Sequence, residues 1–99
     1  MTDVLFDSAY TIAREQLKAA SLATHGALVD KFPQLAFDAT HQAAQRAQHL
    51  YFAALELTMK VWAGSLSYEK AQDALRKQFA EFPEDTCVRA FTDAYIQTR

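Results

Sequence analysis

Apolar and polar residues follow the period of an α-helix in four successive segments of the chain. We assign each residue 100° of rotation about a helix axis and ask where the apolar side chains fall. In the first segment, about residues 3–22, they share one half of the helical wheel: Leu5, Phe6, Ala9, Ile12, Ala13, Leu17 and Ala20. A straight continuation would turn Asp30 and Lys31 into this apolar face. We therefore expect a kink or a break near residues 21–26, where Ser21, Thr24 and Gly26 lie.

The second segment, about Gln34 to Trp62, keeps one phase to its end and has a wide apolar arc. One side of the wheel carries Leu35, Ala39, Ala43, Ala47, Leu50, Ala54, Leu57 and Val61. An adjoining side carries Phe37, Ala44, Tyr51, Leu55 and Trp62. This arc is about twice as wide as the stripe of a helix that packs on one neighbour. The pattern predicts a central helix that is contacted from two sides.

The third and fourth segments have narrower apolar stripes. In the third, Tyr68 to Phe82, the stripe consists of Ala71, Leu75, Phe79 and Phe82. In the fourth, Pro83 to about Thr98, it consists of Cys87, Ala90, Phe91, Ala94 and Tyr95. Cys87 is predicted to be a small core residue, because it falls inside this stripe and has no histidine near it in the sequence.

The two prolines indicate where helices end and begin. Proline lacks a backbone N–H and disfavours helical geometry in the residue before it. Phe32 and Phe82 should therefore end the helices that precede Pro33 and Pro83. Each proline should stand in the first turn of the next helix, where the missing N–H costs nothing.

The break between the second and third segments contains no proline and is predicted from a glycine and a serine. Gly64 can adopt the left-handed conformation that closes a helix. Ser67 is a favoured N-cap, and Glu69 follows in the first turn, where a carboxylate suits the helix dipole. No segment shows the alternation of a β-strand. The sequence predicts an all-α fold: an antiparallel helical bundle of four helices, or five if the first is broken, forming a single domain over residues 1–99.

Composition narrows the classes of function. The chain has 99 residues, ten Lys and Arg against twelve Asp and Glu, and one cysteine. A net charge of −2 lacks the basic surplus of a nucleic-acid-binding domain. A single cysteine excludes an internal disulfide framework and a cysteine-based zinc site, and it favours a cytoplasmic location. The longest apolar run, Leu50 to Leu55, is too short for a membrane span.

One cluster of possible ligands lies on the second predicted helix. Asp38, His41, Gln45 and His49 follow one another at helical spacing along a polar strip. A metal ion, a proton transfer or a small molecule could use such a strip. Metal sites in helical bundles, however, draw their ligands from several facing helices. We therefore expect a solvated surface, with no metal site, no cofactor and no catalytic residues, and retain the strip as the alternative functional site.

Two large apolar residues on the polar side of the same helix, in contrast, are predicted to have a functional role. Phe52 and Met59 lie seven residues apart among glutamines and a carboxylate. An apolar centre with a polar rim is typical of a protein contact surface. The predicted interface consists of Gln48, Phe52, Leu55, Glu56 and Met59.

These observations favour a small non-enzymatic interaction module: an adaptor, a chaperone-like protein or a regulatory partner that acts through helix faces. The wide apolar arc of the second helix would leave apolar surface uncovered in a monomer, so we expect a homodimer. A metal- or small-molecule-dependent activity at Asp38, His41 and His49 is the alternative. Binding to a lipid-like or polymer surface is a third possibility, which the lack of a basic face disfavours for anionic membranes.

Overall fold

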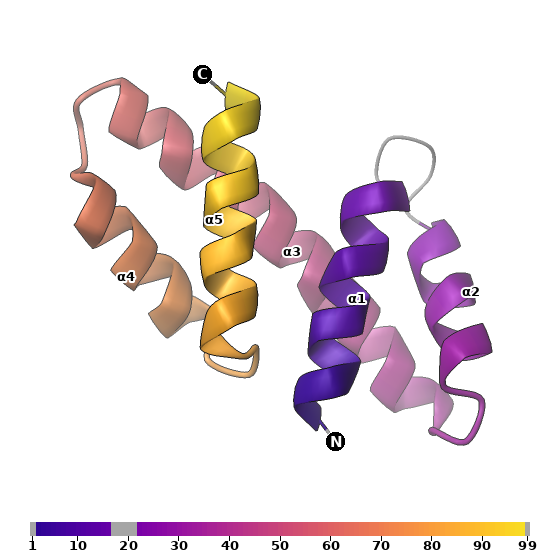
Figure 1. The fold of residues 1–99 in the computed structure, drawn as a ribbon. Coiled ribbons are helices and arrows are strands. Elements are labelled where there is room, and N and C mark those ends of the chain that lie inside the picture. Colours follow the sequence, from indigo (N-terminus) through magenta and orange to yellow (C-terminus); the bar gives the residue numbers. More distant parts are fainter. Residues whose placement is uncertain (1, 17–21, 99) are drawn as a thin grey trace. The chain divides into compact units, whose positions relative to one another are not determined.

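The computed structural model describes residues 2–16 and 22–98, which form five α-helices (Figure 1). They are α1 (Thr2–Gln16), α2 (Leu22–Lys31), α3 (Phe37–Trp62), α4 (Tyr68–Gln78) and α5 (Glu84–Thr98). No strand occurs in these described ranges. The predicted all-α class is confirmed.

The chain divides into two compact units, Met1–His49 and Leu50–Arg99, and the boundary lies inside α3. The single antiparallel bundle and the single domain over residues 1–99 stay predictions.

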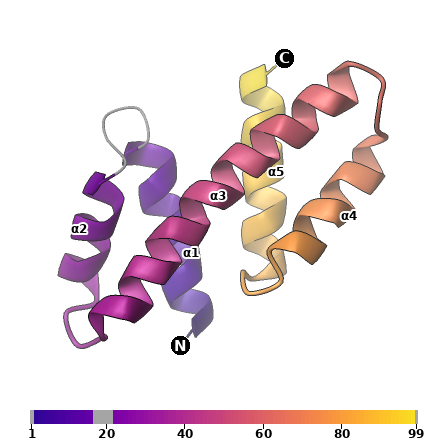
Figure 2. The ribbon, with the colours of Figure 1, turned by 180° about the vertical axis from the view of Figure 1, so that it is seen from behind.

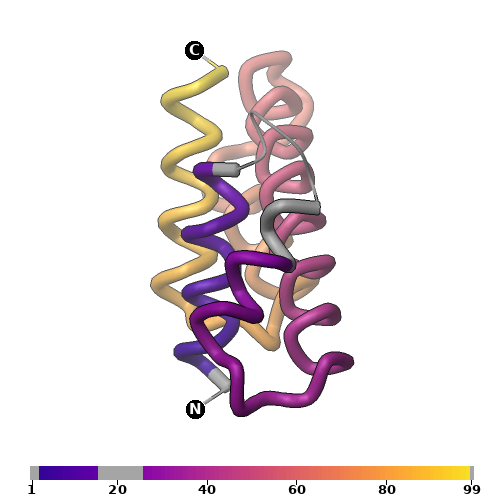
Figure 3. Tube along the Cα trace, turned by 90° about the vertical axis from the view of Figure 1, so that its right-hand side faces the viewer, coloured from indigo at the N-terminus to yellow at the C-terminus, as the bar shows by residue number. Residues whose placement is uncertain are grey.

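In the first unit, α1 and α2 form an antiparallel pair, and the first half of α3 lies against this pair (Figures 1 and 2). The buried side chains come from all three helices: Leu5, Phe6, Ser8, Ala9, Tyr10 and Ala13 of α1, Leu28 of α2, and Thr40, Ala43, Ala44 and Ala47 of α3. The three alanines of α3 present little side-chain bulk, which favours a short distance between packed helices. The helical trace of this unit can be followed in Figure 3.

The kink or break expected near residues 21–26 does not occur at two of the three residues named for it. Thr24 and Gly26 lie inside α2, so the chain does not break at either residue. Ser21 and the predicted helical residues 17–20 lie outside the described residues.

The prediction that α3 begins at Gln34 is wrong, because residues 33–36 form a turn. The backbone N–H of Leu35 donates to Phe32 O at 3.2 Å. The first helical acceptor is Ala36 O, which receives hydrogen bonds from the N–H groups of Ala39 and Thr40. Ala36 thus occupies the N-cap position, and α3 begins at Phe37. α2 ends at Lys31, just before Phe32, in agreement with the expectation that Pro33 disfavours helical geometry in the residue that precedes it.

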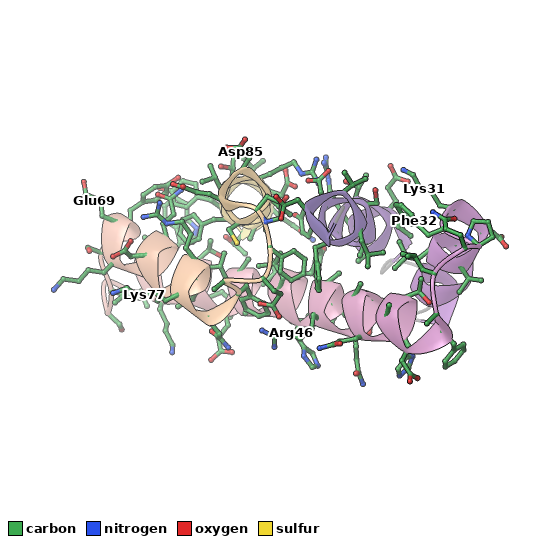
Figure 4. All side chains as sticks on the ribbon, turned by 90° about the horizontal axis from the view of Figure 1, so that it is seen from below. Lys31, Phe32, Arg46, Glu69, Lys77 and Asp85 are labelled. Atoms are coloured by element: carbon green, nitrogen blue, oxygen red, sulfur yellow. The ribbon has the colours of Figure 1, made fainter. Side chains whose placement is uncertain are left out.

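The second unit packs the second half of α3, α4 and α5 around one apolar core. Its buried residues are Leu50, Ala54, Thr58, Ala71, Leu75, Phe79, Phe82, Thr86, Cys87, Ala90, Phe91 and Ala94. The stripes predicted for the third and fourth segments are confirmed as core, except that Tyr95 is only half-buried. On the opposite faces, Glu69 and Lys77 of α4 and Asp85 of α5 point away from the helices (Figure 4).

The predicted helix over residues 68–82 is too long, because α4 ends at Gln78. Phe79 leaves helical geometry at φ −119° and ψ 51°. A turn follows, in which the N–H of Phe82 donates to Phe79 O at 3.0 Å. This turn directs both phenylalanines into the core, so the apolar spacing is correct although the last turn is not α-helical. Pro83 O accepts from the N–H groups of Thr86 and Cys87, which makes Pro83 the N-cap of α5.

The link between α3 and α4 follows the predicted chemistry. Gly64 has φ 81°, in the left-handed region. The N–H of Ser65 donates to Lys60 O and that of Gly64 to Val61 O, both at 3.0 Å, which is the Schellman arrangement. The Ser67 hydroxyl accepts from the N–H of Lys70 at 3.2 Å and caps α4. These hydrogen bonds fix where α3 ends.

Candidate interaction surface

The outer face of α3 carries the two apolar side chains that the sequence placed outside the core. Phe52 is 56% exposed and Met59 is 61% exposed. Leu50, Ala54 and Thr58 are buried on the opposite side of the same helix. We call the set Gln48, Phe52, Leu55, Glu56 and Met59 the α3 outer face.

The polar residues beside these side chains carry little net charge. Glu56 is exposed and lies 3.8 Å from the ammonium group of Lys60, one turn further along the helix. Gln48 and Leu55 are partly buried. Phe52 also makes an edge-to-face contact with Tyr51, at 5.5 Å between ring centroids. The α3 outer face therefore has an apolar centre and an almost neutral rim.

The structure corrects the width of the buried arc on α3. Phe37, the first residue of the helix, is exposed, and Trp62, the last, is 48% exposed. Two threonines of α3, Thr40 and Thr58, are instead buried beside the apolar residues. Their hydroxyls donate to the carbonyl oxygens of Phe37 and Leu55, at 3.0 and 2.8 Å. These intrahelical hydrogen bonds satisfy the buried hydroxyls, so polar residues can occupy core positions.

An aromatic cluster at the end of α3 was not predicted. The Trp62 ring stacks on Tyr95 at 4.7 Å, and Tyr68 meets Tyr95 edge-on at 5.2 Å. The indole Nε1–H of Trp62 donates to Thr98 Oγ1 at 3.1 Å, and that oxygen lies 3.3 Å from Thr58 Oγ1. These contacts join the second half of α3 to the end of α5. They hold the helix that carries the α3 outer face on a packed unit.

An open cavity of about 520 Å³ lies between α4 and α5. Arg76 reaches into it and donates to Asp73 Oδ1 and Glu84 Oε1, both at 2.6 Å. Hydrogen bonding to Asp73 and then to Glu84 raises the pKa of the Arg76 guanidinium. The cavity lining contains two cations, Arg76 and Lys77, and two carboxylates, Asp73 and Glu84, and Lys77 Nζ lies 3.9 Å from Asp73 Oδ2. The lining therefore has no net charge to attract an ionic ligand.

Cys87 also lines this cavity, and it is buried as predicted. Its Sγ lies 3.7 Å from Phe79 O, to which the thiol donates. Burial is the main cause that raises the pKa of Cys87 to about 11, and the charge of Glu81 adds to it. The thiol is therefore protonated near neutral pH and is not an activated nucleophile.

The alternative site is spread along exposed helix surface. Asp38, His41 and His49 are all exposed on α3. The His41 ring stacks on Phe37, with 5.7 Å between ring centroids. Within residues 2–16 and 22–98, no group of three or more His, Cys, Asp or Glu residues could hold a metal ion. Among the described residues, the structure therefore gathers no metal-binding group of side chains at the strip.

In comparisons with known proteins, no family model, no curated protein and no solved structure matches the chain. Among the described helices, none combines the length and the apolar character that crossing a membrane requires.

Proposed function

We propose that this chain is a small non-enzymatic helical interaction module that acts through the α3 outer face and forms a homodimer. As an adaptor, chaperone-like protein or regulatory partner it would work by presenting a helix face to other chains. One observation carries the proposal: Phe52 and Met59 are both more than half exposed on a helix whose other side is buried.

Leaving such side chains in water has a free-energy cost. Large apolar side chains scattered singly over a surface need no explanation. Two of them in line on one helix, with glutamines and an ion pair beside them, form an apolar patch that favours association. In interfaces, truncation of one well-packed central side chain costs about 2 kcal/mol or more, which is roughly a thirtyfold change in Kd.

The proposal is tested by sedimentation equilibrium over a wide range of protein concentration. The wild-type chain should shift from 11.1 kDa towards twice that mass as concentration rises. Phe52→Ser should weaken self-association by about thirtyfold. Ile96→Ser is the matched control, because Ile96 is 58% exposed in the same unit but lies on α5. It should leave self-association within about twofold of the wild type.

Two results would overturn the proposal. A single species of 11.1 kDa at every concentration would remove the homodimer. An equal loss of self-association in Phe52→Ser and Ile96→Ser would show that the α3 outer face is not the surface responsible. Circular dichroism of each variant checks that the helices are retained.

A further inference from the structure

Two side-chain contacts cross the corner where α4 turns into α5 (Figures 1 and 2). Arg76, in the last turn of α4, donates to the carboxylate of Glu84, the first residue of α5, at 2.6 Å. The thiol of Cys87, one turn into α5, donates to the carbonyl oxygen of Phe79 at 3.7 Å. Each contact links residues eight positions apart, and both lie in the second unit. The end of α4 and the start of α5 are therefore linked at two neighbouring points.

The backbone at this corner resists opening less than the middle of a helix does. α4 ends at Gln78, and Pro83 has no backbone N–H with which to close a further turn. Lys77, Gln78 and Ala80 are exposed. Helix ends with solvent-exposed backbone hydrogen bonds open locally at a much lower cost than a core does. A side-chain contact across the corner can therefore change how often the last turn of α4 opens.

Cys87 is the side chain that such an opening uncovers. It is 1% exposed, although it lines the open cavity of about 520 Å³ together with Arg76. Its hydrogen bond to Phe79 O depends on the position of the chain just after α4. When the last turn of α4 moves away from α5, this contact lengthens and the sulfur meets the solvent in the cavity.

We infer that the Arg76–Glu84 ion pair is a latch that keeps the corner between α4 and α5 closed over Cys87. When the pair separates, the corner opens more often and small molecules reach the thiol. Asp73 makes this separation reversible, because it lies on α4 and accepts from Arg76 at 2.6 Å. The guanidinium therefore keeps one carboxylate while it releases the other. This latch is independent of the α3 outer face.

The test is the rate at which the uncharged reagent iodoacetamide alkylates Cys87, the only cysteine of the chain, at one fixed pH. Arg76→Gln removes the latch and should speed alkylation about threefold, which is the size of effect that an exposed ion pair has. Lys77→Gln is the matched control. It removes the same charge from the lining of the same cavity, but the ion pair of Lys77 with Asp73 lies within α4. Its alkylation rate should stay within about 1.5-fold of the wild type.

The sign of the change separates opening of the corner from a simple effect of charge. Iodoacetamide reacts with the thiolate form of cysteine. Burial is the main cause that raises the pKa of Cys87, whereas the positive charge of Arg76 lowers it. Loss of that charge alone would raise the pKa further and slow alkylation. Faster alkylation in Arg76→Gln therefore requires better access to the sulfur.

Faster alkylation of Arg76→Gln with no change in Lys77→Gln supports the latch. An unchanged or lower rate in Arg76→Gln would overturn it, and so would an equal increase in the two variants. Urea denaturation of each variant gives the fraction of chains that are fully unfolded. If that fraction, multiplied by the alkylation rate of the unfolded chain, accounts for the whole observed rate, Cys87 is reached by complete unfolding alone and the latch is refuted.

Discussion

Truncating Phe52 and Leu50 separately gives a matched test of which side of α3 belongs to the core. The two residues lie two positions apart on one helix and in one unit, so their variants report on the same unfolding transition. Leu50 is 0% exposed, whereas Phe52 is 56% exposed. The structure therefore predicts very different costs for Leu50→Ala and Phe52→Ala.

The magnitudes follow from the buried area. Leu50→Ala removes a fully enclosed side chain and should lower the free energy of unfolding by about 2–5 kcal/mol. Less than half of Phe52, roughly 90 Å² of about 200 Å², contacts protein, which corresponds to about 2 kcal/mol at most. Alanine keeps the Cβ contacts and is the better helix former by about 0.5 kcal/mol. The net cost of Phe52→Ala should be about 1 kcal/mol.

The assay is urea denaturation followed by circular dichroism at low protein concentration, so that self-association does not add to stability. A Phe52→Ala variant that is as unstable as Leu50→Ala would show that the phenyl ring packs inside the monomer. That result would remove the main reason for assigning the α3 outer face to an interface.

Three further predictions concern Cys87, the two glycines and the histidine strip. The pKa of Cys87 is raised from 9.0 to about 11 in the folded chain, so the unfolded chain loses this proton first as pH rises. The contribution of Cys87 to stability should therefore be constant below about pH 8. Between about pH 9 and 11, stability should fall by roughly 2 kcal/mol more in the wild type than in Cys87→Ala, measured by urea denaturation at each pH. Gly64→Ala should lower the free energy of unfolding by about 1 kcal/mol, because Gly64 has a positive φ. Gly26→Ala should raise it by up to about 1 kcal/mol, because Gly26 lies inside α2 with open space at the new Cβ. Thermal melts in which both variants shift in the same direction would contradict this pair of predictions. Melting temperatures with and without a chelator should coincide, and a fall of many degrees on chelation would show that Asp38, His41 and His49 hold a metal ion.

Helical periodicity predicted most of the secondary structure because each core stripe is a local pattern. The apolar stripe that contains Leu75 and the one that contains Phe91 are both buried, apart from the half-buried Tyr95. Gly64 and Ser67 act as expected because cap chemistry involves only neighbouring backbone groups.

The errors arise where an apolar residue at helical spacing is held by a turn. Leu35 and Phe82 fit the helical wheel, yet both lie in turns closed by hydrogen bonds to Phe32 and Phe79. A turn can place a side chain in the core as well as a helix can, so periodicity alone cannot separate the two. The predicted width of the apolar arc on α3 is wrong for another reason. Phe37 and Trp62 stand at the helix ends, where less protein surrounds the side chain than at the middle of the helix.

The α3 outer face could be proposed from sequence because Phe52 and Met59 fall on the polar side of an otherwise regular wheel. The aromatic cluster could not. Tyr95 and Thr98 are more than thirty residues from Trp62, and only the folding of α5 back onto α3 brings them together. Contacts between distant segments leave no periodic signal in the chain.

The position of Trp62 has a consequence for spectroscopy. It is the only tryptophan of the chain, and it stacks on Tyr95 with Tyr68 close by. Its fluorescence, including energy transfer from these tyrosines, therefore reports on the second unit, while far-ultraviolet circular dichroism reports on the helices of both. If the first unit melts at a different temperature, the two signals will change at different temperatures. The natural sequence thus carries an intrinsic probe for independent unfolding of its two halves, and no label has to be introduced.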